Sequence, residues 1–457
     1  MLRWLIPLTL LTCACPALAQ YGSSDYLLER YDEDYSYLKN VRSFTDPFDP
    51  IKYIPLGADD WYLSLGGQAR YRYDYFNNTS FGAGRQDEDG FHLFRFLGHA
   101  DVHFGPNVRA FVQIDSSLEY GRTGGVRPGD MDNVDFQQAF LDFNLPLESA
   151  NSVMLRVGRQ ELAYGAQRLV SPSDWSNVRR TFDGAKMVVE TSTDTLEAFI
   201  VRPVTVTNNR LNGDDDHTWF SGIYNVTALP DLFPSAGSKL DLYLLALDKG
   251  VSSVNAVSSD TVTIGSRFHS HPHPWDMDVE FDGQFGRTGD SSIAAYSIAA
   301  EGGYTFSAVM FSPRASLGFD LASGSPNPAH RFNQLFPPLY TYLGHLYLFG
   351  RENIIDLHPA LALTLNRDVT LTFAEHSFWR QNVNDAVYNL DSQVVRAPSG
   401  SHEAFIGAEF DVTLSWQVNR HISAYTGWAH LFTGPFLNDT GAHSDEDFFY
   451  LMATMTF

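Results

Sequence analysis

Apolar and polar residues alternate along most of the chain from about residue 62 onward, which is the period of a β-strand. In the segment YLSLGGQARYRYDYF, Leu63 and Leu65 fall on one face, and Arg70 falls on the other. The same alternation recurs in FHLFRFLGHADVHF, VRAFVQIDSSL, WDMDVEFDGQF and FIGAEFDVTLSWQVN. These runs are roughly ten to fourteen residues long, about twice the usual length of a globular strand. The pattern therefore predicts long antiparallel strands, each with one apolar face and one polar face.

Strands of this length match a tilted crossing of a hydrocarbon layer. We predict an all-β fold, a transmembrane antiparallel β-barrel of about 18 strands, with 16 as the alternative because bacterial barrels have even strand numbers. The weakest strand patterns lie at residues 134–145, 217–227 and 421–432. A short turn is expected at residues 105–107 and a long polar loop at residues 120–133.

The two ends of the chain fit a protein exported to an outer membrane. Residues 1–19 combine Arg3, an apolar run and the small-residue exit Ala17-Leu18-Ala19, so we expect a signal peptide cleaved before Gln20. Both cysteines lie inside it. Residues 20–58 are predicted to be a periplasmic lead-in segment, and residues 59–457 the barrel. The last strand ends on Phe457, which fits the terminal aromatic by which such barrels are recognised for assembly.

Composition agrees with an alternating membrane barrel. Aromatic residues make up 14% of the chain, yet its mean hydropathy is only −0.20, because every lipid-facing residue is followed by a polar one. The formal net charge of −23 argues against nucleic acid as a partner. A secreted, soluble β protein with an aromatic core is the alternative. No cofactor is expected.

If the apolar positions face lipid, several arginines point into the lumen. They are Arg70, Arg72, Arg95, Arg109 and Arg156. Such guanidinium groups could select anions in a pore. Acidic residues share the same face, however, so a wall of mutually neutralising ion pairs is equally compatible with the pattern. These acids are Asp74, Asp101, Asp115, Asp278, Glu280, Asp282, Glu409 and Asp411.

Residues 157–187 concentrate basic and aromatic residues between two strands. The glycines and a proline in this segment predict a strand end, a structured loop and a return strand. Its cations Arg159, Arg168, Arg179 and Arg180, beside Trp175, would suit a polymer of acidic sugars. Alternatively, the aromatic residues belong to a membrane-interface belt and the arginines bind lipopolysaccharide phosphates.

This segment makes the chain resemble the alginate export family of outer-membrane proteins. The resemblance rests on VGRQELAYGAQRLV with DWSNVRRTFDGAK, on residues 332–359, and on AHLFTGPFLNDTG with the closing DFFYLMATMTF. It implies a monomeric, 18-stranded barrel in the outer membrane that secretes an anionic exopolysaccharide, with possible periplasmic secretion partners. It also implies that Arg159, Arg168, Arg179 and Arg180 are pore cations, and it adds Arg351 and His345 from the central loop.

Three functions remain to be compared. Passive export of an alginate-like polymer is the first, and a diffusion porin for uptake of small anionic or polar nutrients is the second. An enzyme is disfavoured, because neither a G-x-S-x-G nor an H-E-x-x-H motif occurs. The alternating histidines His269, His271 and His273 could bind a metal. Their pattern is more typical of a solvated turn, however, so no metal site is predicted.

Overall fold

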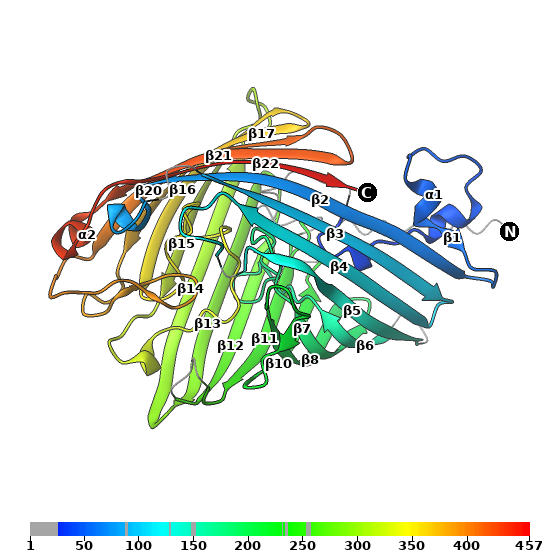
Figure 1. Cartoon of the computed structure of the whole chain (residues 1–457), viewed down its shortest axis with the longest axis horizontal. Coiled ribbons are helices and arrows are strands. Elements are labelled where there is room, and N and C mark those ends of the chain that lie inside the picture. Colours follow the sequence, from blue (N-terminus) through cyan, green and yellow to red (C-terminus); the bar gives the residue numbers. More distant parts are fainter. Residues whose placement is uncertain are drawn as a thin grey trace.

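The computed structural model describes residues 26–86, 90–127, 129–147, 152–230, 232–233, 236–252 and 257–457. The expected signal peptide at residues 1–19 lies outside the described residues. The described residues form one large antiparallel sheet of 20 strands. Two of these strands have only two residues: β1 (Ile54–Pro55) pairs with β2 (Trp61–Asn77), and β9 (Gly213–Asp214) pairs with β8 (Asp194–Thr205). The other 18 strands close into a barrel (Figure 1).

The barrel strands follow one another in chain order. They are β2 (Trp61–Asn77), β3 (Phe91–Phe104), β4 (Val108–Tyr120), β5 (Asp132–Pro146), β6 (Ser152–Gln160), β7 (Phe182–Glu190), β8 (Asp194–Thr205), β10 (Thr218–Ala228), β11 (Lys239–Lys249), β12 (Ser259–Ser270), β13 (Trp275–Thr288), β14 (Ser291–Thr305), β15 (Arg314–Ala322), β16 (Ile354–Asn366), β17 (Val369–Trp379), β20 (Phe405–Gln417), β21 (Ile422–Thr433) and β22 (Glu446–Thr456). The predicted strand number of 18 is confirmed. The three weakest predictions are confirmed too, as β5, β10 and β21.

The barrel closes where the first strand meets the last. β2 pairs with β22 from Gln68 opposite Thr456 to Asn77 opposite Asp447, and Figure 1 shows the two strands side by side. Gly67 and Phe457 exchange backbone hydrogen bonds of 2.9 and 3.0 Å just beyond the ladder. Closure satisfies the backbone groups that an open sheet edge would expose to hydrocarbon.

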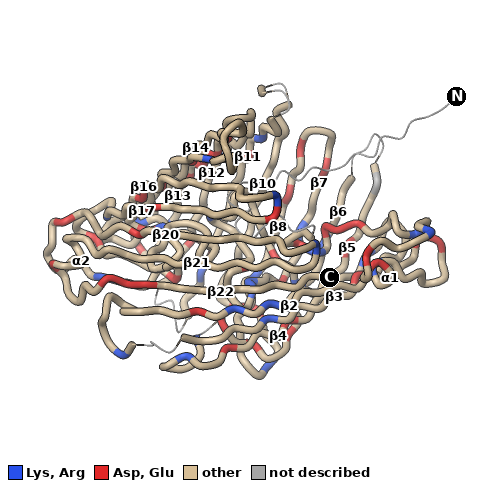
Figure 2. Tube along the Cα trace, turned by 90° about the horizontal axis from the view of Figure 1, so that it is seen from above, with Lys and Arg blue, Asp and Glu red and all other residues tan. Residues whose placement is uncertain are grey.

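The alternation along each strand sorts side chains between the two faces of the barrel. On β3, Phe96 is 43% exposed, whereas its neighbour Arg95 is 2% exposed. Phe281 and Leu451 are also exposed, while Asp282 is buried. The outer face is therefore apolar, as lipid requires, and the charges lie inside. Figure 2 shows both signs of charge distributed along neighbouring strands.

The remaining short elements lie at the strand ends. A short β18–β19 ribbon pairs Val387–Tyr388 with Val394–Arg396. The helices are α1 (Asp49–Lys52) and α2 (Pro435–Thr440), with 3-10 turns at Arg30–Asp32, Ser36–Asn40, Thr79–Gly82 and Pro328–His330. In the described part of the chain, no helix combines the length and the apolar character needed to cross a membrane.

Residues 26–53 fold against the barrel end that carries the C-terminus. Arg30 donates to the carbonyl oxygen of Phe457 at 2.9 Å. The ring of Tyr31 packs edge-on against the stacked rings of Phe111 and Phe140, at centroid distances of 5.9 and 5.4 Å. Arg156 covers that tyrosine ring at 4.0 Å. The segment is thus bound to the inner wall as well as to the rim.

Two long connections fold inward and pack their apolar side chains against those of the barrel wall in one hydrophobic core. Residues 161–181 join β6 to β7, which confirms the predicted order of strand, loop and return strand, and residues 323–353 join β15 to β16. We call them the first and second inward loops. They pair at Val170 and Phe336, where Phe336 donates its N–H to the carbonyl oxygen of Leu169 at 2.9 Å. The core of the molecule therefore fills part of the lumen.

Candidate functional site

The first inward loop is held by arginines from β2 and β3. Arg70 donates to the carbonyl oxygen of Asp174 at 2.6 Å and to that of Ser176 at 2.9 Å. Arg95 donates to the same Asp174 carbonyl oxygen at 2.9 Å and to the Asp174 carboxylate at 2.7 Å. Arg72 donates to the carbonyl oxygen of Trp175 at 2.5 Å. These three arginines, predicted as pore cations, thus anchor the loop.

Asp174 is the electrostatic centre of this anchor. Burial alone would raise the pKa of its carboxyl group, but Arg95, Arg179 and Arg70 outweigh burial and hold the pKa well below its usual range. The carboxylate therefore stays ionised in the folded protein.

Trp175 joins the first inward loop to the second. Its indole stacks on the ring of Tyr340 with centroids 3.6 Å apart and an angle of 6° between the planes. Arg72 covers the indole at 4.2 Å. Tyr340 in turn stacks on His345 at 4.3 Å. The aromatic stack thus links the two inward loops. His345, predicted as a site residue, belongs to this stack, and its burial lowers the pKa of its imidazole.

Nine of the ten predicted pore cations lie within ion-pair distance of a carboxylate. Besides the three anchors, these pairs are Arg109–Asp101 (2.7 Å), Arg156–Asp142 (2.8 Å), Arg159–Asp183 (2.8 Å), Arg168–Glu280 (2.8 Å), Arg179–Glu161 (2.5 Å) and Arg351–Asp320 (2.6 Å). A uniformly basic lumen does not follow from this arrangement. For these nine residues the geometry favours the alternative of an ion-paired wall.

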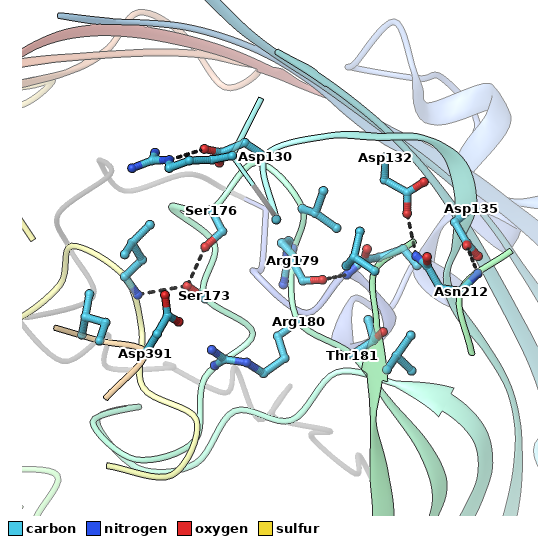
Figure 3. Close-up of a pocket in the computed structure, with 18 of the residues that line it drawn as sticks. Asp130, Asp132, Asp135, Ser173, Ser176, Arg179, Arg180, Thr181, Asn212 and Asp391 are labelled. Atoms are coloured by element: carbon cyan, nitrogen blue, oxygen red, sulfur yellow. Dashed lines mark hydrogen bonds and ion pairs between the residues drawn. The ribbon is translucent and has the colours of Figure 1, made fainter. Parts of the chain in front are cut away.

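Arg180 differs from the other nine. It lines a cavity of about 300 Å³ between the two inward loops and the strands β5 and β8. Two other arginines line the same cavity: Arg127 pairs with Asp130 at 2.8 Å, and Arg179 pairs with Glu161. Among the described residues, no carboxylate oxygen lies within 4.0 Å of the Arg180 guanidinium. Figure 3 shows this guanidinium pointing toward the side of the cavity where Asp391 lies.

Neutral carbonyl groups hold Arg180 in place. Its Nη1 donates to the carbonyl oxygens of Ser171 at 2.9 Å and Pro337 at 3.0 Å, one from each inward loop. Burial lowers the pKa of Arg180 to about 10, and Asp391 opposes this effect. The group is still a cation at neutral pH. It is positioned for a carboxylate or phosphate, which a guanidinium binds with two parallel hydrogen bonds.

Several residues of this cavity could not be found by sequence reasoning. Asp391, Asn212 and Pro337 come from three separate connections. Asn212 donates its side-chain amide to Asp132 at 2.6 Å, as Figure 3 shows. Pro337 lies in the segment 332–359 that carries the family resemblance, but nothing in the local sequence marks Asp391 or Asn212, because the folding of the loops brings them to the cavity.

The histidines singled out in the sequence do not belong to a potential metal-ligand group among the described residues. The rings of His269 and His271 are 6.0 Å apart, and the potential ligand group found among the described residues is a different one, Asp356 with His358 and His376. The sequence offered a weak signal for it, since Asp356 and His358 share one face of a strand.

Comparison with known proteins agrees with this architecture. A family model described as alginate export matches residues 61–450. A search of curated proteins gives no match.

Solved outer-membrane channels of Pseudomonas aeruginosa share the fold. OccK8 (OprE) is 12% identical with a TM-score of 0.56, covering 86% of this chain and 98% of the other. OccD3 (OpdP) is 10% identical with a TM-score of 0.57, covering 89% and 92%. OpdK, solved with vanillate, is 11% identical with a TM-score of 0.56, covering 86% and 98%. The molecule is thus an integral outer-membrane barrel of porin-like fold, a kind of protein that is not usually an enzyme.

Proposed function

Because the chain belongs to the alginate export family of β-barrel channels, we propose that it exports an anionic, alginate-like exopolysaccharide passively through its lumen, as a monomer. The observation that carries the proposal is Arg180, a cavity-lining arginine for which the described residues supply no carboxylate partner. A uronate carboxylate would take the place that acidic side chains occupy at the other lumen arginines. No catalytic step is part of this function.

In this proposal the inward loops separate as the polymer passes. The cavity of about 300 Å³ at their seam is the size of a small molecule. Since Arg180 bonds to Ser171 in one loop and Pro337 in the other, it lies at the seam that must open. In this proposal an entering uronate competes for the guanidinium and weakens the seam. The cargo would thereby promote its own passage.

We further propose that the barrel end against which residues 26–53 fold faces the periplasm, where it can meet the growing polymer and any periplasmic secretion partner. The opposite end of the barrel then faces lipopolysaccharide. The lead-in segment, bound through Arg30 and Tyr31, lies at the proposed entrance.

Uptake of small anionic nutrients is the second candidate. The size of the cavity favours uptake, because about 300 Å³ suits one small carboxylate such as the vanillate found with OpdK. The same guanidinium would serve both functions. They differ in whether the inward loops have to part.

Single-channel recording with uronate monomers and oligomers separates the two. For export, we expect oligomers to block the current with residence times that increase with chain length, and Arg180→Ala to shorten them. Arg202→Ala is the control, because Arg202 pairs with Asp214 at 2.8 Å on the exposed rim. Blocking by monomers alone would favour uptake. Equal oligomer blocking in wild type and Arg180→Ala would refute the role of Arg180 in either function.

A further inference from the structure

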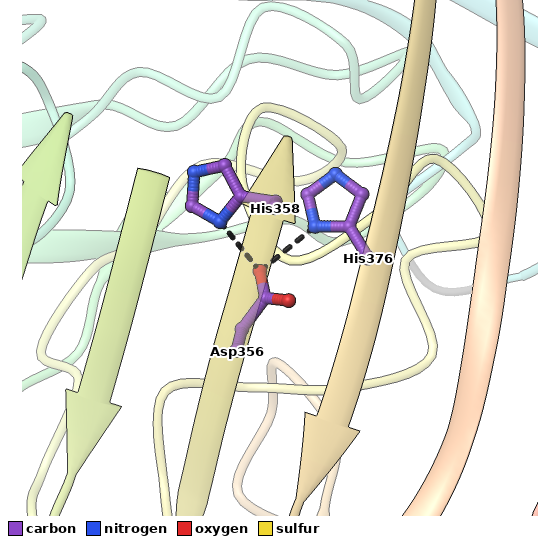
Figure 4. A group of neighbouring side chains, drawn as sticks. All are labelled: Asp356, His358 and His376. Carbon is purple, nitrogen blue, oxygen red and sulfur yellow. Dashed lines mark hydrogen bonds and ion pairs between the residues drawn. The ribbon is translucent and has the colours of Figure 1, made fainter. Parts of the chain in front are cut away.

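A second group of side chains on the lumen wall is separate from the Arg180 cavity. Asp356 and His358 lie two residues apart on β16, so both point to the inner face, and His376 lies on the neighbouring strand β17. Their potential ligand atoms all lie within 4.8 Å of one another. Figure 4 shows the two imidazole rings turned toward one oxygen of Asp356.

The distances suit ligands of a single ion. Asp356 Oδ2 lies 2.8 Å from His376 Nδ1 and 3.0 Å from His358 Nδ1. Two ligands of a tetrahedral ion at about 2.1 Å are separated by about 3.4 Å, so a small movement of these side chains would give ligand spacing. Two imidazoles and one carboxylate on one side of an ion form a recurrent site for first-row transition metals.

Two polar atoms of the group have no hydrogen-bond partner among the described residues. His358 Nδ1 is one of them despite its short distance from Asp356. Asp356 Oδ1 is the other; the side chain is fully buried, and only its Oδ2 is hydrogen-bonded, to His376 Nδ1. A buried carboxylate oxygen without a partner is costly, and a divalent cation would compensate it.

The surroundings preserve this arrangement. On β15, Gly318 leaves room for the His358 ring, because a Cβ at position 318 would collide with it. Beyond His376, an oxygen of Asp411 lies 3.9 Å from Nε2, the nitrogen that points away from Asp356. A carboxylate behind a metal-bound imidazole is a common orienting feature of metal sites.

We propose that Asp356, His358 and His376 bind one divalent transition-metal ion of the Zn²⁺ class on the lumen wall. The ion would link β16 to β17. The remaining coordination positions face the lumen, where water or a carboxylate can enter.

Metal titration of the purified full-length barrel in detergent tests the proposal. After treatment with a chelator, the protein is titrated with Zn²⁺, and bound metal is measured by elemental analysis; Co²⁺ absorption reports the ligand geometry. We expect one ion per chain, and an affinity about tenfold or more weaker in His376→Ala and in Asp356→Asn. Gly318→Ala keeps all three ligands but displaces the His358 ring, so it should also weaken binding.

His430→Ala is the matched control, because His430 pairs with Asp447 at the same 2.8 Å but belongs to no three-ligand group among the described residues. It should leave Zn²⁺ affinity unchanged. Far-ultraviolet circular dichroism establishes that each variant is folded. Two results would overturn the proposal: wild type does not bind Zn²⁺ stoichiometrically, or wild type and His376→Ala bind it with equal affinity. Either result would mean that the group is only a hydrogen-bonded imidazole–carboxylate cluster. Neither result bears on export, which depends on Arg180.

Discussion

Replacing Asp174 with asparagine should release the first inward loop. The change keeps the size of the side chain but removes the charge that faces Arg95 at 2.7 Å, Arg179 at 3.6 Å and Arg70 at 4.0 Å. Breaking a buried ion pair by neutralising one partner costs about 3–5 kcal/mol. Since each 1.4 kcal/mol is a factor of ten, the loop should be undocked roughly a hundred to a few thousand times more often than in wild type.

Planar-bilayer recording measures this effect as the fraction of time spent in a high-conductance state. The backbone carbonyl bonds from Arg70, Arg72 and Arg95 remain in the variant, so the loop should open without the barrel unfolding. Asp60→Asn is the control, because the exposed Lys39–Asp60 pair at 2.7 Å contributes at most about 1 kcal/mol. If Asp174→Asn shows the wild-type open fraction, the anchor does not close the channel.

Two further predictions concern the second inward loop and the lead-in segment. Burial raises the pKa of the Glu352 carboxyl group to about 7, although Ser392 and Arg331 oppose this shift. Because this pKa exceeds the usual 4.5, Glu352 stabilises the docked loop fully below about pH 4.5. This stabilisation is lost as the pH rises through 7. Conductance should therefore increase across that window, and Glu352→Gln should abolish the step; an identical pH profile in the variant would contradict this. Tyr31→Ala should loosen residues 26–53 by about 3–5 kcal/mol, since it removes a buried ring that packs edge-on against Phe111 and Phe140. Limited proteolysis should then cut this segment faster than in Tyr37→Ala, whose ring is 58% exposed, and equal rates would refute the packing argument.

The barrel could be predicted from the sequence because alternation is a local property. Whether Phe96 faces outward and Arg95 inward depends only on the period of the strand and on which solvent meets the apolar face. Even the weak pattern at residues 421–432 was sufficient, and it forms β21. The strand number followed from counting such segments.

The state of each arginine could not be predicted in the same way. Arg159 and Asp183 are register partners in one hairpin, so a sufficiently exact register would have paired them. Arg168, in contrast, meets Glu280 across 112 residues of chain, and only the folded loop brings them together. Arg179 and Arg180 are adjacent in sequence, yet Arg179 faces Glu161 and Arg180 faces the cavity. Among the ten predicted cations, the one without a carboxylate partner in the described part of the chain could be identified only from the folded structure.

The reversal potential in a salt gradient is the most direct test of Arg180 as the selecting cation. Wild type, Arg180→Lys and Arg180→Ala are compared in the same bilayer and at the same pH. We predict that wild type prefers anions, that Arg180→Lys keeps most of this preference because the charge is preserved, and that Arg180→Ala loses it. A wild-type channel that prefers cations, with a reversal potential unchanged in Arg180→Ala, would contradict the proposed function.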